Sequence, residues 1–253
     1  MLPTFYKRWL PLLGPLLFFL LWYLAVSSGW VNKVLLPSPL DTLTHMGKAL
    51  SSGDMFKDVV ATFMRTLTSF GIAAVIGVPV GIALGSSEVA YRSVEFLIDF
   101  FRSTPSSALI PLFLLIFGIS DTNKIAIAAF AAVLVILFNS AYGVMSARKT
   151  RIMAAKVMGV HPWYIFRDVL LLESLSQTFV GLRNGISMAL VIVIVAEMFI
   201  GSENGLGHRI IDAQQILNVK DMYASILITG ALGYFLNVAF LLIEKKFVHW
   251  SGK

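Results

Sequence analysis

Long apolar runs without charged residues recur along this chain, and they restrict what it can fold into. A helix needs roughly 20 such residues to cross about 30 Å of hydrocarbon. Five runs of about that length, and a sixth that is interrupted by Arg183 and Glu197, predict spans at residues 9–29, 66–87, 101–120, 125–147, 174–200 and 222–243. With 57% hydrophobic and 13% charged residues, the chain has too few polar groups to cover its apolar surface in water. We therefore expect an all-α, polytopic membrane protein, with about six transmembrane helices in one domain over residues 1–253.

Basic residues are unevenly divided between the two sides that six alternating spans define. One side, which includes both termini, receives Lys7, Arg8, Arg92, Arg148, Lys149, Arg151, Lys156, Arg167, Lys245, Lys246 and Lys253. On the other side, Lys and Arg are interleaved with Asp. Because loops rich in Lys and Arg stay in the cytoplasm, both termini are expected there. The formal net charge of +6 is then a topology signal, and it does not indicate nucleic-acid binding.

Small residues and prolines mark two of the predicted spans. Gly77, Gly81 and Gly85 recur every four residues and share one helix face, which predicts close packing against another helix. A contact that slides between two states is the alternative interpretation. In the third span, Pro105 and Pro111 remove backbone donors, which is tolerated where the freed carbonyls meet protein or a water-filled cavity. The prolines predict either a broken helix that lines a pathway or a simple kink.

A polar, basic loop at residues 148–173 separates the fourth and fifth spans. Ala154 and Ala155 are spaced for a short helix, Gly159 is expected to end it, and His161 and Trp163 follow in an aromatic turn. Such an exposed helix, with small residues on one face, is suited to docking onto a soluble partner. The alternative is an interfacial helix that rests on lipid headgroups.

This loop resembles the signature loop of the inner-membrane permease subunits of bacterial binding-protein-dependent ABC importers. The family's loop reads Glu-Ala-Ala, three residues, Gly, nine residues, Ile, one residue, Leu-Pro. Ala154, Ala155, Gly159, Val169 and Leu171 stand in register with it, whereas Met153 replaces the glutamate and Leu172 the final proline. Residues 36–39, 65, 102–105, 181–183, 196–198 and 205–207 extend the likeness over nearly the whole chain, and they resemble the nitrate, sulfonate and taurine branch.

The resemblance implies that the chain forms the translocation pathway of an ATP-driven importer in a bacterial inner membrane. The implied partners are a second permease copy, a periplasmic or lipid-anchored substrate-binding protein, and two cytoplasmic ABC ATPases. The ATPases would hold the loop at Ala154, Ala155, Gly159, His161 and Trp163. The branch implies a small oxyanion such as nitrate, taurine or an alkanesulfonate as the solute. A thiamine-precursor pyrimidine or another heterocycle is the alternative.

No phosphate-binding Gly-x-x-x-x-Gly-Lys-Ser/Thr loop occurs in the sequence. We therefore expect this chain to be no enzyme and to bind no cofactor, with ATP and Mg²⁺ used by the partner ATPase. The four histidines are scattered among separate loops, so no metal site is predicted. Two other classes stay as alternatives. A membrane-embedded enzyme needs a clustered catalytic set, and a passive channel tends to have a filter of polar residues.

Arg183 and Glu197 are the ionisable candidates for a pathway lining, because charges at membrane depth usually face a cavity or a partner. They lie about 21 Å apart along one helix and cannot pair with each other. For Glu197 the alternatives are solvation at the outer interface or a structural bond to a neighbouring helix, and for Arg183 an extension toward the headgroups.

Overall fold

The computed structural model describes residues 4–29, 31–32 and 34–247, and within these residues every regular element is helical. This confirms the all-α prediction. The elements are α1 (Thr4–Ser27), α2 (Pro39–Ser51), α3 (Phe56–Gly85), α4 (Glu88–Ser103), η1 (Ser106–Leu109), α5 (Ile110–Phe117), α6 (Asp121–Met145), α7 (Lys149–Val157), α8 (Pro162–Ile165), η2 (Phe166–Leu170), α9 (Leu171–Ile200), α10 (Leu206–Gln215) and α11 (Val219–Phe247).

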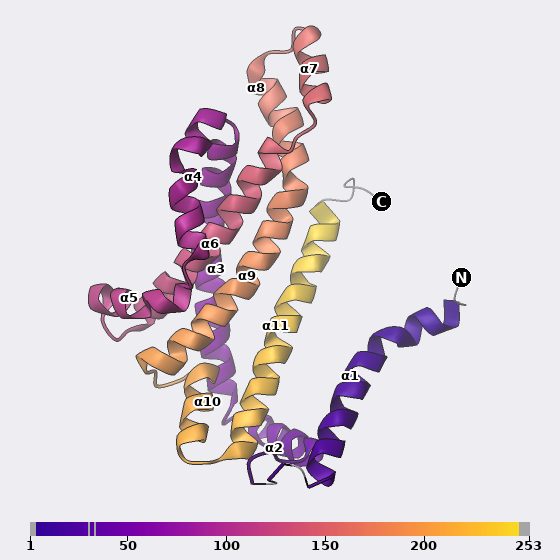
Figure 1. Ribbon diagram of the computed structural model, residues 1–253, viewed down its shortest axis with the longest axis vertical. Helices are drawn as coiled ribbons and strands as arrows, with labels where there is room; N and C mark the ends of the chain where they lie inside the picture. The colour runs from indigo at the N-terminus through magenta and orange to yellow at the C-terminus, as the bar shows by residue number, and fades with distance from the viewer. Residues whose placement is uncertain (1–3, 30, 33, 248–253) are drawn as a thin grey trace.

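Helix α6 packs between α3 and α9 along most of its length (Figure 1). On the α3 side, a Cβ at Gly81 would lie 2.5 Å from the Leu137 carbonyl oxygen, and one at Gly85 would lie 2.5 Å from the Ala141 carbonyl oxygen. A Cβ at Gly77 would lie 3.0 Å from the Ile136 side chain of α6. The three glycines therefore lie where the two backbones come closest, and whether this contact slides stays a prediction.

The contact between α6 and α9 depends on the same kind of small residue, which the sequence analysis did not single out. A Cβ at Gly185 would lie 2.6 Å from Ile136 Cγ1, and one at Gly143 would lie 2.9 Å from the Ser174 carbonyl oxygen. Close approach of helices at small residues is common in membrane bundles, because it increases van der Waals contact without a hydrophobic driving force.

In the part of the chain that the structure describes, four helical segments are long and apolar enough to cross a membrane: α3, α6, α11 and the continuous helix Pro162–Ile200. The apolar helix Leu12–Ser27 within α1 is shorter. The predicted span at residues 66–87 begins earlier, at Phe56, because the polar residues in its added turns are buried against partners from α9 and α10. The predicted loop at residues 148–173 is also largely helical, since α8, η2 and α9 follow one another without interruption.

The predicted span at residues 101–120 is broken in the structure. Helices α4 and η1–α5 meet at an angle of 91°, and a fifth spanning segment results only if this bent pair counts as one. Thr104 is extended because a residue that precedes proline avoids the helical region, and Pro105 then begins the new direction. Pro111 lies in the first turn of α5, where its missing donor costs no hydrogen bond. The number of six spans stays a prediction.

The two ends of the bundle differ in structure. The hairpin formed by α7 and α8 projects at one end, together with the turn between α3 and α4, whereas α2 and α10 lie at the opposite end (Figure 1). We refer to these as the hairpin end and the α10 end. Helix α11 runs from the α10 end toward the hairpin end, so its last residues lie on the same side as the hairpin.

Candidate functional site

The hairpin begins with α7, which ends at Gly159 in a Schellman motif. Gly159 has a φ of 72°, a conformation that costs a glycine little. The Val160 N–H donates to the Ala155 carbonyl at 3.0 Å, and the Gly159 N–H donates to the Lys156 carbonyl at 3.0 Å. The predicted helix end at Gly159 is therefore present in the structure.

Helix α8 starts immediately after this turn and connects the hairpin rigidly to the bundle. Nδ1 of His161 accepts a hydrogen bond from the Trp163 N–H at 3.3 Å, which caps α8, and Pro162 occupies its first turn. A π-helical turn at Phe166–Leu170 then joins α8 to α9, so that one helix runs from Pro162 to Ile200. No loop therefore separates α8 from the membrane-spanning part of α9.

The tip of the hairpin is apolar and exposed. Val157 is 88% exposed, Met158 80%, Met153 65% and Trp163 57%. Ala154, Gly159 and His161 are also exposed, and Ala155 is half-buried. Single exposed apolar side chains are normal, but a contiguous group of this size at the water-facing end of a bundle is typical of an interaction surface. The structure thus brings the five predicted docking residues together on one projecting element.

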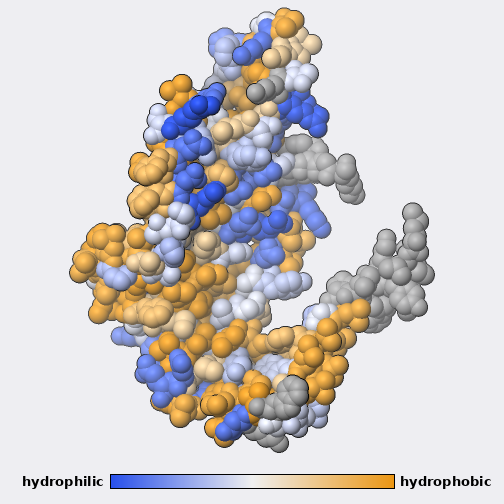
Figure 2. Space-filling model, viewed as in Figure 1, coloured by the Kyte–Doolittle hydropathy of each residue, from blue (hydrophilic) through white to orange (hydrophobic). Residues whose placement is uncertain are grey.

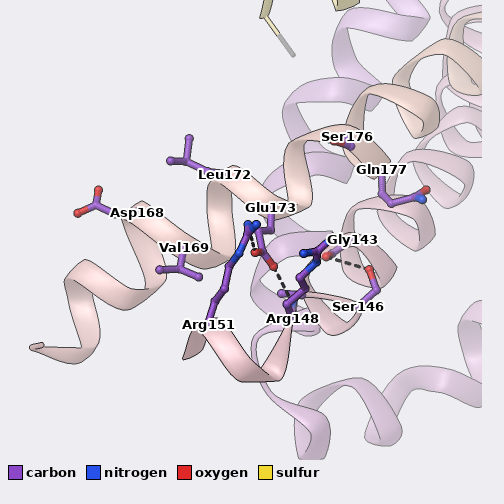
Figure 3. Close-up of a pocket in the computed structure, with 11 residues that line it drawn as sticks. Gly143, Ser146, Arg148, Arg151, Asp168, Val169, Leu172, Glu173, Ser176 and Gln177 are labelled. Atoms are coloured by element: carbon purple, nitrogen blue, oxygen red, sulfur yellow. Dashed lines mark hydrogen bonds and ion pairs between the residues drawn. The ribbon is translucent and has the colours of Figure 1, made fainter. Parts of the chain in front are cut away.

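Glu173 in the first turn of α9 ties the base of the hairpin to the bundle. Its carboxylate accepts a hydrogen bond from the Arg148 N–H at 2.7 Å and another from Arg151 Nη1 at 2.6 Å (Figure 3). These residues line a pocket of about 690 Å³ between α6, α7 and α9. The sequence analysis missed Glu173, although an acidic residue at the very end of a basic loop was an available signal.

Arg183 lies in a groove of about 740 Å³ between α9 and α11. Asn184, Ser187, Tyr234 and Asn237 line the same part of the groove, and Arg183 is the one charged residue among the described residues that line it. Figure 2 shows hydrophilic residues gathered on the face where α9 and α11 run side by side, whereas hydrophobic residues cover α5. Arg183 is thus the predicted pathway residue that the structure places in a cavity.

Pro105 and Pro111 are not brought to this groove. Both are exposed at the break between α4 and α5, on the other side of the bundle (Figure 1). Among the described residues, no group of three or more His, Cys, Asp or Glu is arranged to hold a metal ion. The pathway candidates therefore lie in separate places rather than in one site.

Glu197 is fully buried and held by three groups. Its Oε1 accepts from Arg65 Nη1 at 2.7 Å, its Oε2 accepts from the Gly207 N–H at 2.9 Å, and the Thr62 hydroxyl lies 3.0 and 2.9 Å from the two oxygens. A carboxylate held in this way is a structural bond between helices, which is one alternative that the sequence left open. A pathway role for Glu197 requires the bundle to open and stays a prediction.

Arg65 extends this bond into a network of charges at the α10 end. Its Nη2 lies 2.8 Å from Asp121 Oδ1, and its Nη1 donates to the Asn204 carbonyl at 2.7 Å. Arg65 therefore joins α3 to α6, α9 and the loop that precedes α10. The sequence analysis noted Arg65 only for its resemblance to a family, because nothing in the local pattern names partners that are more than 50 positions away.

A second hub of the same network is Arg209 on α10, which pairs with Asp54, Asp58 and Asp221 at 2.9, 3.1 and 2.9 Å. Burial alone would lower the pKa of Arg209, but hydrogen bonds to the three carboxylates outweigh burial and raise that pKa above its usual value. In return, the Arg209 guanidinium lowers the pKa of the exposed Asp54 carboxyl. The α10 end is therefore a rigid, internally paired surface.

Comparisons with known proteins agree with this arrangement. Residues 77–249 match the family described as the binding-protein-dependent transport system inner membrane component. The chain is 31% identical over 232 residues to a Brucella abortus (strain 2308) protein named as an ABC transporter permease, covering 92% of this chain and 91% of that protein. It is 28% identical over 249 residues to SsuC of Escherichia coli (strain K12), named as an aliphatic sulfonates transport permease, covering 97% and 94%.

A solved structure shares the fold. A chain of the methionine ABC transporter MetNI, in an inward-facing conformation, matches with a TM-score of 0.64 and 23% identity, over 76% of this chain and 95% of that chain. At this identity the likeness concerns the fold alone. From the family match and the relatives together, the chain belongs to the inner-membrane permease subunits of binding-protein-dependent ABC importers, in the nitrate, sulfonate and taurine branch.

Proposed function

We propose that two copies of this chain form the pathway of an importer for a small oxyanion, which separate ATPase subunits drive through the α7–α8 hairpin. The observation that carries the proposal is the hairpin itself, with its exposed apolar tip and its continuous helical connection to α9. A partner that binds and displaces the tip also displaces α9, because no loop lies between Pro162 and Ile200. Exchange between two packings of a helical bundle is a known form of switching.

The ATPase supplies the nucleotide chemistry in this proposal. Two such subunits, one for each copy, bind ATP and Mg²⁺ and take the hairpin tip into a groove. Basic residues of the hairpin, Arg148 and Arg151 at its base and Lys156 near its tip, favour an acidic rim on that groove. Glu173 supports the contact by fixing the base of the hairpin.

The second permease copy covers the groove between α9 and α11. Lipid tails cannot hydrogen-bond Arg183, Asn184 or Asn237, so a polar strip at membrane depth needs protein or water against it. Two such grooves facing each other form a water-filled path with a polar lining. We place the hairpin end and both termini in the cytoplasm, following the excess of Lys and Arg on that side.

The solute is delivered to the α10 end by a substrate-binding protein, either periplasmic or anchored to lipid. Membership of the branch and the relative named for aliphatic sulfonates favour a small oxyanion such as nitrate, taurine or an alkanesulfonate. A pyrimidine or another heterocycle is the alternative solute, and uptake assays with both classes distinguish them.

The test introduces a charge at the hairpin tip. Val157→Glu should leave the chain folded in the membrane, because this side chain is 88% exposed, but it should prevent co-purification of a co-expressed ABC ATPase and abolish ATP-dependent uptake. Val89→Glu is the matched control, since Val89 is 78% exposed at the same end of the bundle but away from the hairpin. Normal ATPase binding and uptake by Val157→Glu would contradict the proposal.

A further inference from the structure

The charge of Arg183 is only partly neutralised by its nearest acidic group. Nη1 of Arg183 lies 3.7 Å from Glu244 Oε2 on α11, which is an ion pair but is too long for a good hydrogen bond. Glu244 Oε2 is itself buried and has no hydrogen-bond partner in the part of the chain that the structure describes. The two side chains are 31% and 24% exposed. Both members of this pair therefore keep unused hydrogen-bonding capacity.

The groove exposes the cation and not its counter-ion. Arg183 lines the groove, whereas Glu244 lies outside the groove lining. The wall also changes along its length. On α9, the stretch from Leu190 to Val195 is apolar, while Arg183, Asn184 and Ser187 at the other end are polar. This polar end is extended across the groove by Tyr234 and Asn237 of α11.

We propose that the polar end of this groove is an anion-binding subsite, in which Arg183 contacts the charged group of the solute and Glu244 weakens that contact. The inference rests on the proposed import function and adds a site and a charge class to it. A guanidinium presents several N–H donors in a fixed fork, which matches the paired oxygens of an oxyanion. Amide and hydroxyl groups from Asn184, Tyr234 and Asn237 provide further hydrogen-bond donors around the same point, whereas the Ser187 hydroxyl already donates to the Arg183 carbonyl at 3.3 Å.

The position of the subsite sets the order of contacts along the path. Arg183 lies about 25 Å from the end of α9 at Ile200, so a solute from the α10 end passes the apolar wall before it reaches the cation. In a narrow path with low-dielectric walls, one charge that is only partly neutralised still raises the local concentration of its counter-ions. Glu244 prevents the anion from being held too firmly, because a channel or carrier must also release what it binds.

The test measures the charge preference of the groove without relying on transport. The chain has no cysteine, so Ser187→Cys places a single thiol on the groove wall. In membranes that carry the assembled importer, this thiol is modified with 2-sulfonatoethyl methanethiosulfonate, itself an alkanesulfonate, and with the cationic 2-(trimethylammonium)ethyl reagent. The quantity of interest is the ratio of the two modification rates, anionic over cationic.

Arg183→Gln should lower this ratio about fivefold or more, and Glu244→Gln should raise it, because a unit charge within a few ångströms changes the local potential by that order. Arg92→Gln is the control: it removes the same charge from an exposed position on α4 that is paired with Glu88. A ratio that does not change in Arg183→Gln, or that falls equally in Arg92→Gln, overturns the subsite. If Arg183→Gln does not reach the membrane, the Glu244→Gln variant is the test. An unchanged ratio of modification rates in that variant overturns the subsite.

The two proposals fail in different ways. An importer that binds its ATPase and takes up solute, but has the same ratio with and without Arg183, keeps the proposed function and loses the subsite. If Val157→Glu still binds the ATPase and takes up solute normally, the proposed ATPase coupling is rejected, whatever the ratio of modification rates at position 187.

Discussion

At the scale of single residues, the structure assigns Glu197 to a buried bond that the sequence could only list among alternatives. The carboxylate has no exposed surface and is held by Arg65, Thr62 and the Gly207 N–H. Taking two charges out of water is costly, and their attraction compensates for this only when the remaining hydrogen bonds are also satisfied. Here they are satisfied. Loss of one partner therefore leaves the other charge buried without a counter-charge, and its full desolvation cost then destabilises the fold.

Glu197→Gln should therefore destabilise the folded chain, by about 3 to 5 kcal/mol, the usual cost of breaking a buried ion pair. The measurement is unfolding of the purified chain in mixed micelles with a denaturing detergent. Glu203→Gln is the control, because Glu203 is exposed in the loop that precedes α10. If Glu197→Gln unfolds like the control while uptake is lost, the residue acts in the pathway and the structural interpretation fails.

At the scale of elements, close backbone contacts determine how the helices pack. Helix α3 carries glycines in two different environments: a Cβ at Gly81 would lie 2.5 Å from the Leu137 carbonyl oxygen, whereas one at Gly71 would meet no atom within 4 Å. Gly71 lies outside the four-residue series formed by Gly77, Gly81 and Gly85, so the sequence pattern singles out Gly81 but does not identify the residues that it contacts. Only the neighbouring helix decides which glycine is required.

The pair offers a matched experiment on one helix. Gly81→Ala should destabilise the chain by about 1 to 3 kcal/mol, because a methyl group cannot be fitted against the α6 backbone without moving the two helices apart. Gly71→Ala should be neutral or stabilising by about 0.5 to 1 kcal/mol, since alanine is the better helix former. Detergent unfolding of both variants checks this, and equal stabilities would mean that α3 and α6 are not in close contact.

At the scale of the whole molecule, the fold places the hairpin and the α10 network at opposite ends of the bundle. The proposed direction of transport requires that these ends face different compartments. Lys and Arg near the hairpin end predict that this end is cytoplasmic. Labelling of exposed positions at the two ends tests this orientation.

Cysteines at exposed positions 52 and 203, both at the α10 end, should react with an impermeant maleimide added to intact cells. Cysteines at positions 86 and 150, both exposed at the hairpin end, should react only after the cells are permeabilised. The absence of native cysteine keeps the background low. Labelling of position 150 in intact cells would show that the orientation is the opposite one, with the proposed ATPase contact outside the cytoplasm.

The fold class, the membrane-spanning character and the helix end at Gly159 follow from the sequence, whereas the docking role of the loop at residues 148–173 stays a prediction. The fold class, the spans and the helix end depend on local properties. The length of an apolar run is compared with the bilayer thickness, and a helix end is predicted from a glycine and the residues next to it. The likeness of residues 153–172 to a family's loop was also local, and it identified the importer family that the comparisons established.

The folded structure was needed to show the break between α4 and α5, the early start of α3, the roles of Glu173 and Glu197, and the close contacts at Gly143 and Gly185. These features depend on which residues meet across helices. Glu197 is tolerable at membrane depth only because Arg65, which lies 132 positions earlier in the chain, reaches it. The energy of a buried charge or of a helix contact belongs to a pair, and a sequence pattern describes one member of the pair at a time.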